Sequence, residues 1–164
     1  TTAGWDVLRG IIDGGRGPLR EAIALAAGWR AAGYLTDAQS TDLETLLTDI
    51  VVTGRKDWSG PRAAASAEAA IGLVELGHPI PGTPARIKQI LLRSLLDDVR
   101  SREVGLRFAA CCATAPQKVR ALLVAELTKL IERDARIDSL GDQAIEDEQL
   151  LAELRRIVPI LEAS

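Results

Sequence analysis

Aromatic and sulfur-containing side chains are scarce in this chain of 164 residues. Three Trp, one Tyr and one Phe make up 3% of the residues, and there are two Cys and no Met. Proteins that bind single-stranded nucleic acid usually stack the bases on aromatic rings, so this composition weighs against that function. The net charge of −3 also gives the whole molecule no attraction to phosphate backbones or anionic membranes.

Long apolar runs and paired cysteines are missing as well. The longest uncharged apolar segment is AIALAAGW, residues 22–29, far short of the roughly 18 residues that a membrane-spanning helix needs. Cys111 and Cys112 are neighbours, which cannot form an ordinary disulfide within a helix and have no second pair to complete a zinc site. We therefore expect a cytoplasmic location. Because the chain begins with Thr-Thr-Ala-Gly and has no Met, we also expect it to be part of a longer polypeptide.

Residues that carry out chemistry are few and scattered. A catalytic or metal-binding pair is one interpretation of Asp97 and Asp98. Adjacent residues at a helix end diverge, however, so a role in a turn or cap is the favoured interpretation. Cys111 and Cys112 have no Lys or Arg in the same turn to activate a thiol, which favours packing over redox chemistry. His78 is the only histidine and precedes a proline, so we interpret it as a loop residue. We expect no catalytic, cofactor or metal site.

Apolar residues recur at helical spacing along almost the whole chain, and no sustained alternation typical of a strand is present. The sequence therefore predicts an all-α fold of about eight helices. The fourth helix should bury one stripe, formed by Ala63, Ala67, Ala70, Ile71 and Val74. The predicted helices cover approximately residues 5–13, 18–32, 36 or 41 to 53, 61–74, 87–95, 104–112, 116–131 and 150–161.

Several residues predict where helices begin and end. Pro18 suits the first turn of the second helix, and Gly33 suits the position after its last residue. Thr36 or Thr41 can cap the third helix, which should end at Gly54. The proline-rich segment 78–84, HPIPGTP, predicts a longer connector.

The C-terminal part has its own predicted features. An acidic connector, residues 134–148, should precede the eighth helix. Pro159 should kink or end that helix, because proline removes one backbone hydrogen bond.

The eight predicted helices form four pairs, and the first three pairs share a pattern. Each has an Asp near the connector between its helices and an Arg early in the second helix. The acids are Asp13, Asp57, Asp97 and Asp98, and the arginines are Arg20, Arg62 and Arg107. The arginines are 42 and 45 positions apart, so the unit repeats with a nearly constant period.

A two-helix unit with this period resembles the HEAT/armadillo family of helical repeats. The third pair is the most similar: its first helix ends in LLDD, and VRSREVGLRFAACCA follows, with Val104, Arg107 and small residues in the second helix. Gly105 and Leu106 separate Val104 from Arg107, which departs from the adjacent Val-Arg of the family. The fourth pair has Ala152 where the Arg would fall.

The resemblance implies a right-handed α-solenoid of about four antiparallel helix pairs, in one domain covering residues 1–164. The approximate repeats are 3–33, 36–77, 84–114 and 117–162. A single helix pair is too small to bury its apolar stripe, so stacked neighbours would form a continuous core. An Asp in the turn that pairs with an Arg would align successive repeats. A compact bundle of the same helices, with a regulatory role, is the alternative.

We expect the chain to be a non-catalytic interaction or scaffolding module that binds a protein partner. From Arg86 to Arg120 the net charge is +5, and from Ala121 onward it is −5. The candidate partner-binding residues are Arg55, Lys56, Trp58, Arg86, Lys88, Arg93, Arg100 and Arg102. In the simplest alternative these charges are only solvated helix faces, and Trp58 folds back as a plug. The disfavoured alternative is a HEAT-like nucleic-acid-binding protein or DNA-repair glycosylase that uses the basic third repeat.

Overall fold

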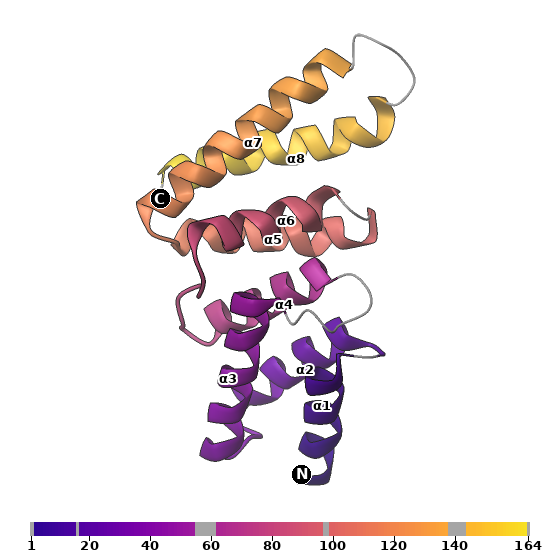
Figure 1. Cartoon of the computed structure of the whole chain (residues 1–164), viewed down its shortest axis with the longest axis vertical. Coiled ribbons are helices and arrows are strands. Elements are labelled where there is room, and N and C mark those ends of the chain that lie inside the picture. Colours follow the sequence, from indigo (N-terminus) through magenta and orange to yellow (C-terminus); the bar gives the residue numbers. More distant parts are fainter. Residues whose placement is uncertain (1, 16, 55–61, 97–98, 138–143, 164) are drawn as a thin grey trace. The chain divides into compact units, whose positions relative to one another are not determined.

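The computed structural model describes residues 2–15, 17–54, 62–96, 99–137 and 144–163, and every regular element in these ranges is a helix (Figure 1). The elements are α1 (Thr2–Gly14), α2 (Leu19–Ala31), α3 (Asp37–Thr53), α4 (Arg62–Glu75), α5 (Pro84–Leu96), η1 (Val99–Ser101), α6 (Arg102–Cys111), η2 (Cys112–Thr114), α7 (Gln117–Ile137) and α8 (Ala144–Ala163). The prediction of an all-α fold is confirmed. None of these helices is long and apolar enough to cross a membrane.

The two ends of α3 follow from local chemistry. Thr36, the nearer of the two predicted caps, accepts a hydrogen bond from the backbone N–H of Gln39, and the Gln39 side chain accepts one from the backbone N–H of Thr36. This reciprocal capping box satisfies two backbone donors at the start of the helix. At the other end Gly54 has φ +69°, a left-handed conformation that glycine adopts without steric cost.

The C-terminal helices are longer than the sequence predicts. α7 runs to Ile137 and α8 begins at Ala144, so most of the expected connector over residues 134–148 is helical. α8 also continues through Pro159 to Ala163, so the proline does not end it. One missing backbone hydrogen bond in a long helix does not outweigh the burial of Ile157 and Leu161, which are 1% and 0% exposed.

The chain divides into two compact units, Thr1–Phe108 and Ala109–Ser164. In the second unit α7 and α8 lie side by side and bury Leu123 and Leu154. Arg120 joins their ends: its Nε donates to the Ala115 carbonyl at 3.0 Å, and its Nη1 donates to the Leu161 carbonyl at 3.0 Å. The start of α7 therefore lies beside the end of α8.

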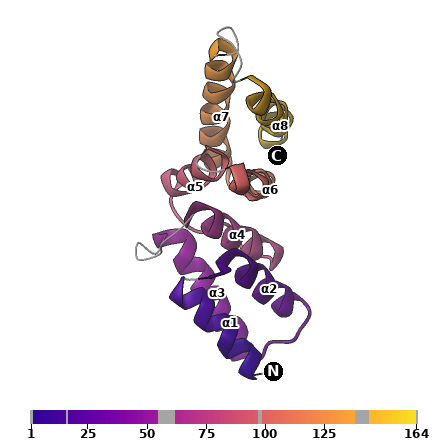
Figure 2. The ribbon, with the colours of Figure 1, turned by 90° about the vertical axis from the view of Figure 1, so that its right-hand side faces the viewer.

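In the first unit α4 is the central helix. It packs against α2, α3 and α5, and Figure 2 shows it between α2 and α3 on one side and α5 on the other. All ten residues from 64 to 73 are buried, whereas the sequence predicts a single buried stripe. Small side chains permit this, because neighbouring backbones can come close: a Cβ added at Gly72 would lie 3.3 Å from the Cβ of Ala27.

Candidate functional site

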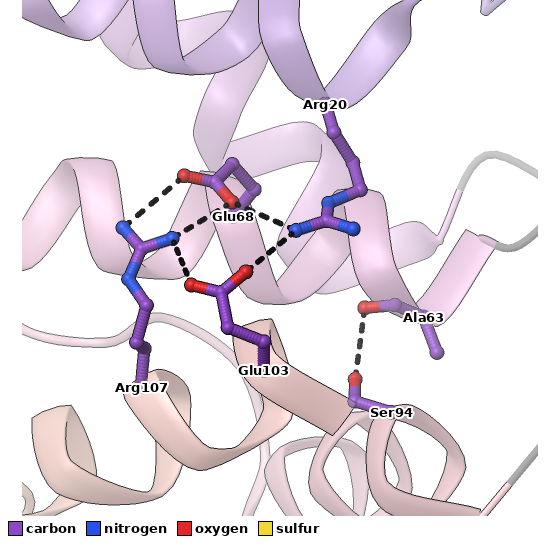
Figure 3. Close-up of polar contacts among 6 residues, drawn as sticks. All are labelled: Arg20, Ala63, Glu68, Ser94, Glu103 and Arg107. Carbon is purple, nitrogen blue, oxygen red and sulfur yellow. Dashed lines mark hydrogen bonds and ion pairs between the residues drawn. The ribbon is translucent and has the colours of Figure 1, made fainter. Parts of the chain in front are cut away.

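Two of the predicted repeat arginines meet a single carboxylate in the interior of the first unit. Arg107 of α6 places Nη1 3.4 Å from Oε2 of Glu68 and Nη2 3.5 Å from Oε1. Arg20 of α2 places Nη2 3.8 Å from Oε2 of the same carboxylate. Glu103 contacts both arginines, at 3.6 Å and 3.7 Å (Figure 3). These four residues, the Glu68 cluster, connect α2, α4 and α6.

The burial of Glu68 decides the electrostatics of this cluster. Its side chain is 7% exposed, and burial raises the pKa of Glu68 although Arg107 and Arg20 act to lower it. The contacts of 3.4–3.8 Å are longer than the roughly 2.7–2.9 Å of a strong charge-assisted bond. Arg20 Nε is buried without a hydrogen-bond partner. Such a cluster fixes how helices are placed more than it stabilises them.

The cluster differs from the pairing that the repeat pattern suggests. The sequence predicts that turn aspartates align the repeats, but the contacts of Arg20 and Arg107 go to glutamates on α4 and α6. Asp13 is exposed on α1. Asp57, Asp97, Asp98 and the side chain of Arg62 lie outside the described residues. One signal for Glu68 was present: it is the only charge in the segment AAASAEAAIGL.

The predicted basic partner surface is partly used for internal hydrogen bonds. Arg86 donates from Nε to the Val51 carbonyl at 2.8 Å and from Nη2 to Oγ of Ser66 at 3.0 Å. Burial lowers the pKa of Arg86, and its guanidinium lies so close to Gly54 that an added Cβ would be 2.8 Å away. These contacts make Arg86 a structural residue that joins α5 to α3 and α4.

The other residues of the predicted basic partner surface differ in exposure and in their contacts. Arg102 donates from Nε to the Leu95 carbonyl at 3.2 Å. Arg93 and Arg100 are exposed, and Lys88 is half-buried. Arg55, Lys56 and Trp58 lie outside the described residues. With Arg86 and Arg102 engaged by the protein itself, the structure adds no support for phosphate-backbone binding.

A groove lies between α3 and the connector that follows α4. It has a volume of about 630 Å³. We call it the α3 groove; its lining residues are Thr41, Glu44, Thr45, Thr48, Asp49, Val52, Thr53, Leu73, His78, Pro79 and Pro81. Sequence reasoning missed it, although Thr41, Thr45, Thr48 and Val52 have the spacing of one helix face.

The surface of the α3 groove is more apolar than its threonines suggest. Thr45 donates its hydroxyl to the Thr41 carbonyl at 2.9 Å, and Thr53 donates its hydroxyl to the Asp49 carbonyl at 2.7 Å. These donors are therefore satisfied within the helix. Val52 is 46% exposed. The lining contains two carboxylates and no Lys or Arg.

One end of the α3 groove is held by Glu44. His78 Nε2 lies 3.0 Å from Glu44 Oε1, and Arg30 Nη2 lies 3.7 Å from the same oxygen. Glu44 thus joins the connector and α2 to α3. The sequence places His78 in a loop, and the structure confirms this position while adding the contact with Glu44.

The two cysteines, for which the sequence predicts a packing role, differ in burial. Cys112 is fully buried, and burial raises the pKa of its thiol. Cys111 is half-buried, and neither cysteine is part of a disulfide bond. Within the described ranges no group of three or more His, Cys, Asp or Glu side chains is arranged to hold a metal ion.

Comparison with known proteins identifies no relative. No protein-family model, no curated protein and no solved structure matches this chain.

Proposed function

We propose that the chain is a non-catalytic protein-interaction module that holds a segment of its partner in the α3 groove. The observation that carries this proposal is the groove itself, which combines an exposed Val52, two prolines and two threonines, Thr45 and Thr53, whose hydroxyls are already bonded within α3. Apolar, water-exposed concavities on a folded scaffold are where proteins bind partners. HEAT-like stacking of the helix pairs and a cytoplasmic location belong to the same proposal.

The buried side of α3 supports this role. Leu43, Leu47 and Ile50 are all 0% exposed, and α3 packs against α4, whose residues 64–73 are buried. The helix that forms the floor of the groove is therefore anchored along its length. A preformed surface loses little conformational entropy when a partner binds, so more of the contact energy appears as affinity.

A hydrolytic site is the competing interpretation, because a His–Glu contact also occurs in catalytic triads. Such a triad needs a nucleophile that donates its hydroxyl to the histidine. Thr45 lines the groove, but its hydroxyl donates a hydrogen bond to the Thr41 carbonyl. The Nε2 atom of His78 contacts Glu44. The contacts favour a structural role for the His78–Glu44 pair.

Site-specific photo-cross-linking in the cells that produce the chain tests the proposal. A photoreactive residue at Thr48 should capture a protein that the same residue at Val7 does not. Val7 is a matched control, since it is a residue on α1 with 64% exposure and does not line the groove.

The captured protein is then purified, and its affinity is measured for the wild type, Val52→Arg and Val7→Arg. We expect Val52→Arg to weaken binding about tenfold or more, because it places a charge in the apolar contact, and Val7→Arg to bind as the wild type does. Equal affinities for the two variants would contradict the proposal.

A further inference from the structure

We propose that one face of α5 holds a second binding site, separate from the α3 groove, which takes a phosphoryl group. The site is an open hollow of about 560 Å³, which we call the α5 hollow. Its lining residues are Ala85, Arg86, Lys88, Gln89, Leu92 and Arg93. None of them lines the α3 groove, so this inference goes beyond the proposed function and does not depend on it.

The charge of Arg86 has no counter-charge among the described residues. Its guanidinium donates from Nε to the Val51 carbonyl at 2.8 Å, from Nη2 to Oγ of Ser66 at 3.0 Å and from Nη1 to Oε1 of Gln89 at 2.8 Å. All three acceptors are uncharged. Burial lowers the pKa of Arg86, and the positive charge of Arg93 lowers it further. Such a half-buried cation beside a second cation is stabilised when an anion joins the two.

The same contacts hold the guanidinium in position for an anion. Arginine has five N–H donors, so three hydrogen bonds leave one N–H on each Nη atom. The bonds to α3 and α4 fix the side chain. An anion therefore does not have to order Arg86 when it binds, and more of the contact energy appears as affinity.

The rest of the α5 hollow also presents donors. Oε1 of Gln89 accepts the bond from Arg86, which leaves the side-chain NH₂ group of Gln89 for a ligand. Arg93 lies about two turns along α5 from Arg86 and is exposed. Lys88 adds a positive charge but has an interaction of its own, and the inference does not need it. The lining contains no Asp or Glu.

A phosphoryl group matches these donors better than other common anions do. It carries a charge of about −1.5 to −2 near neutral pH and has three acceptor oxygens, whereas a carboxylate has one charge for two arginines. Nucleic acid gains its affinity from many phosphates bound in a row, and the α5 hollow covers only about two turns of one helix. Leu92 and Ala85 offer apolar contact to whatever carries the phosphoryl group.

An NMR titration of backbone amides with inorganic phosphate at constant ionic strength tests the inference. Arg93→Gln should weaken binding about tenfold, because it removes hydrogen bonds from a charged donor. Arg155→Gln is the matched control: Arg155 is exposed on α8 and does not line the hollow, so its affinity should stay within about twofold of the wild type. Equal losses in the two variants, acetate bound as tightly as phosphate, or no phosphate binding by the wild type would overturn the inference.

A second variant tests the premise that Arg86 lacks a counter-charge. Gln89→Glu keeps the shape of the side chain and its contact with Arg86, and it places a carboxylate where the ligand would bind. We expect the urea midpoint to rise and phosphate binding to weaken about tenfold or more. Gln149→Glu makes the same change at an exposed residue of α8 and should do neither. If Gln89→Glu is no more stable than the wild type and binds phosphate equally well, the inference is wrong.

Two carriers identify the source of the phosphoryl group. The titration is repeated with phenyl phosphate, a small ester, and with a short peptide that contains one phosphoserine. Tighter binding of either carrier than of inorganic phosphate, with the same loss in Arg93→Gln, supports the inference and distinguishes a small molecule from a modified protein. Duplex DNA that binds more tightly than both carriers and loses affinity steeply with salt would instead indicate contacts to a phosphate backbone, and the inference would be wrong.

Discussion

Two glutamates of the first unit have similar partners but different surroundings. Glu68 contacts Arg20 and Arg107, and Glu44 contacts Arg30 and His78. Glu68 is 7% exposed in the middle of α4, whereas Glu44 is 26% exposed at the groove. A buried charge cluster constrains helix placement, and a partly exposed one holds a surface in shape at little energetic cost. Burial, and not the number of partners, separates the two roles.

The largest effect is expected where α6 meets α5, beside the Glu68 cluster. A Cβ added at Gly105 would lie 3.0 Å from the Cβ of Ser94 and 3.1 Å from its backbone carbon, so in Gly105→Ala the backbone of α5 at Ser94 must shift by a few tenths of an ångström. We expect the free energy of unfolding in urea to fall by about 1–3 kcal/mol. Gly28→Ala is the control: nothing lies within 4 Å of the added Cβ, and it should stabilise α2 by about 0.5–1 kcal/mol. Equal effects would show that Gly105 is not needed for close packing.

Removing the buried carboxylate should have the next largest effect. Glu68→Ala leaves Arg20 and Arg107 with the exposed Glu103 as their remaining partner in the cluster. We expect a loss of about 1–2 kcal/mol in urea unfolding, below the range for fully buried pairs because both arginines are partly exposed. Glu68→Gln, which keeps the shape and an acceptor, should stay within about 1 kcal/mol of the wild type. A larger loss for Gln than for Ala would contradict this account.

The raised pKa of Glu68 predicts a pH dependence of stability. The folded state keeps the proton of Glu68 at pH values where the unfolded chain has lost it, so stability must fall as the pH rises above 4.5, the ordinary value, and through the raised one. Glu68→Gln has no group at this position that gains or loses a proton in this pH range. The stability of the wild type relative to Glu68→Gln should therefore decrease from acidic to neutral pH. Urea unfolding of both proteins across this range provides the measurement, and an increase would mean that the arginines outweigh burial.

The sequence predicts the helices well because large apolar residues mark them clearly. Leu43, Leu47 and Ile50 have the expected spacing and are fully buried. α4 shows where this signal fails: alanine fits a buried or an exposed position, so a helix of small residues does not reveal that other helices surround it. Gly105 lies close to Ser94 of α5, a contact that the spacing of apolar residues does not predict.

The candidate site was less predictable. The repeat spacing identified Arg20 and Arg107 as members of one structural set, but their common partner depends on tertiary packing that spacing does not encode. The same holds for the α3 groove, because its second wall is formed by the path of a proline-containing connector. The excess of basic residues made Arg86 a candidate for partner binding. Its guanidinium donates hydrogen bonds to Val51 and Ser66 inside the first unit.

The smallest effect is expected at Glu44, and it gives the sharpest contrast with Glu68. Glu44→Ala removes the contact that holds His78 at 3.0 Å and Arg30 at 3.7 Å. Because the pair is partly exposed, water replaces the lost interactions, and we expect the free energy of unfolding to fall by less than about 1 kcal/mol. A double-mutant cycle of Glu44→Ala with His78→Ala should give a coupling energy no larger than about 0.5–1 kcal/mol. A loss at Glu44 equal to that of Glu68→Ala would show that exposure does not separate the two roles, because the groove end would then be as constrained as the interior.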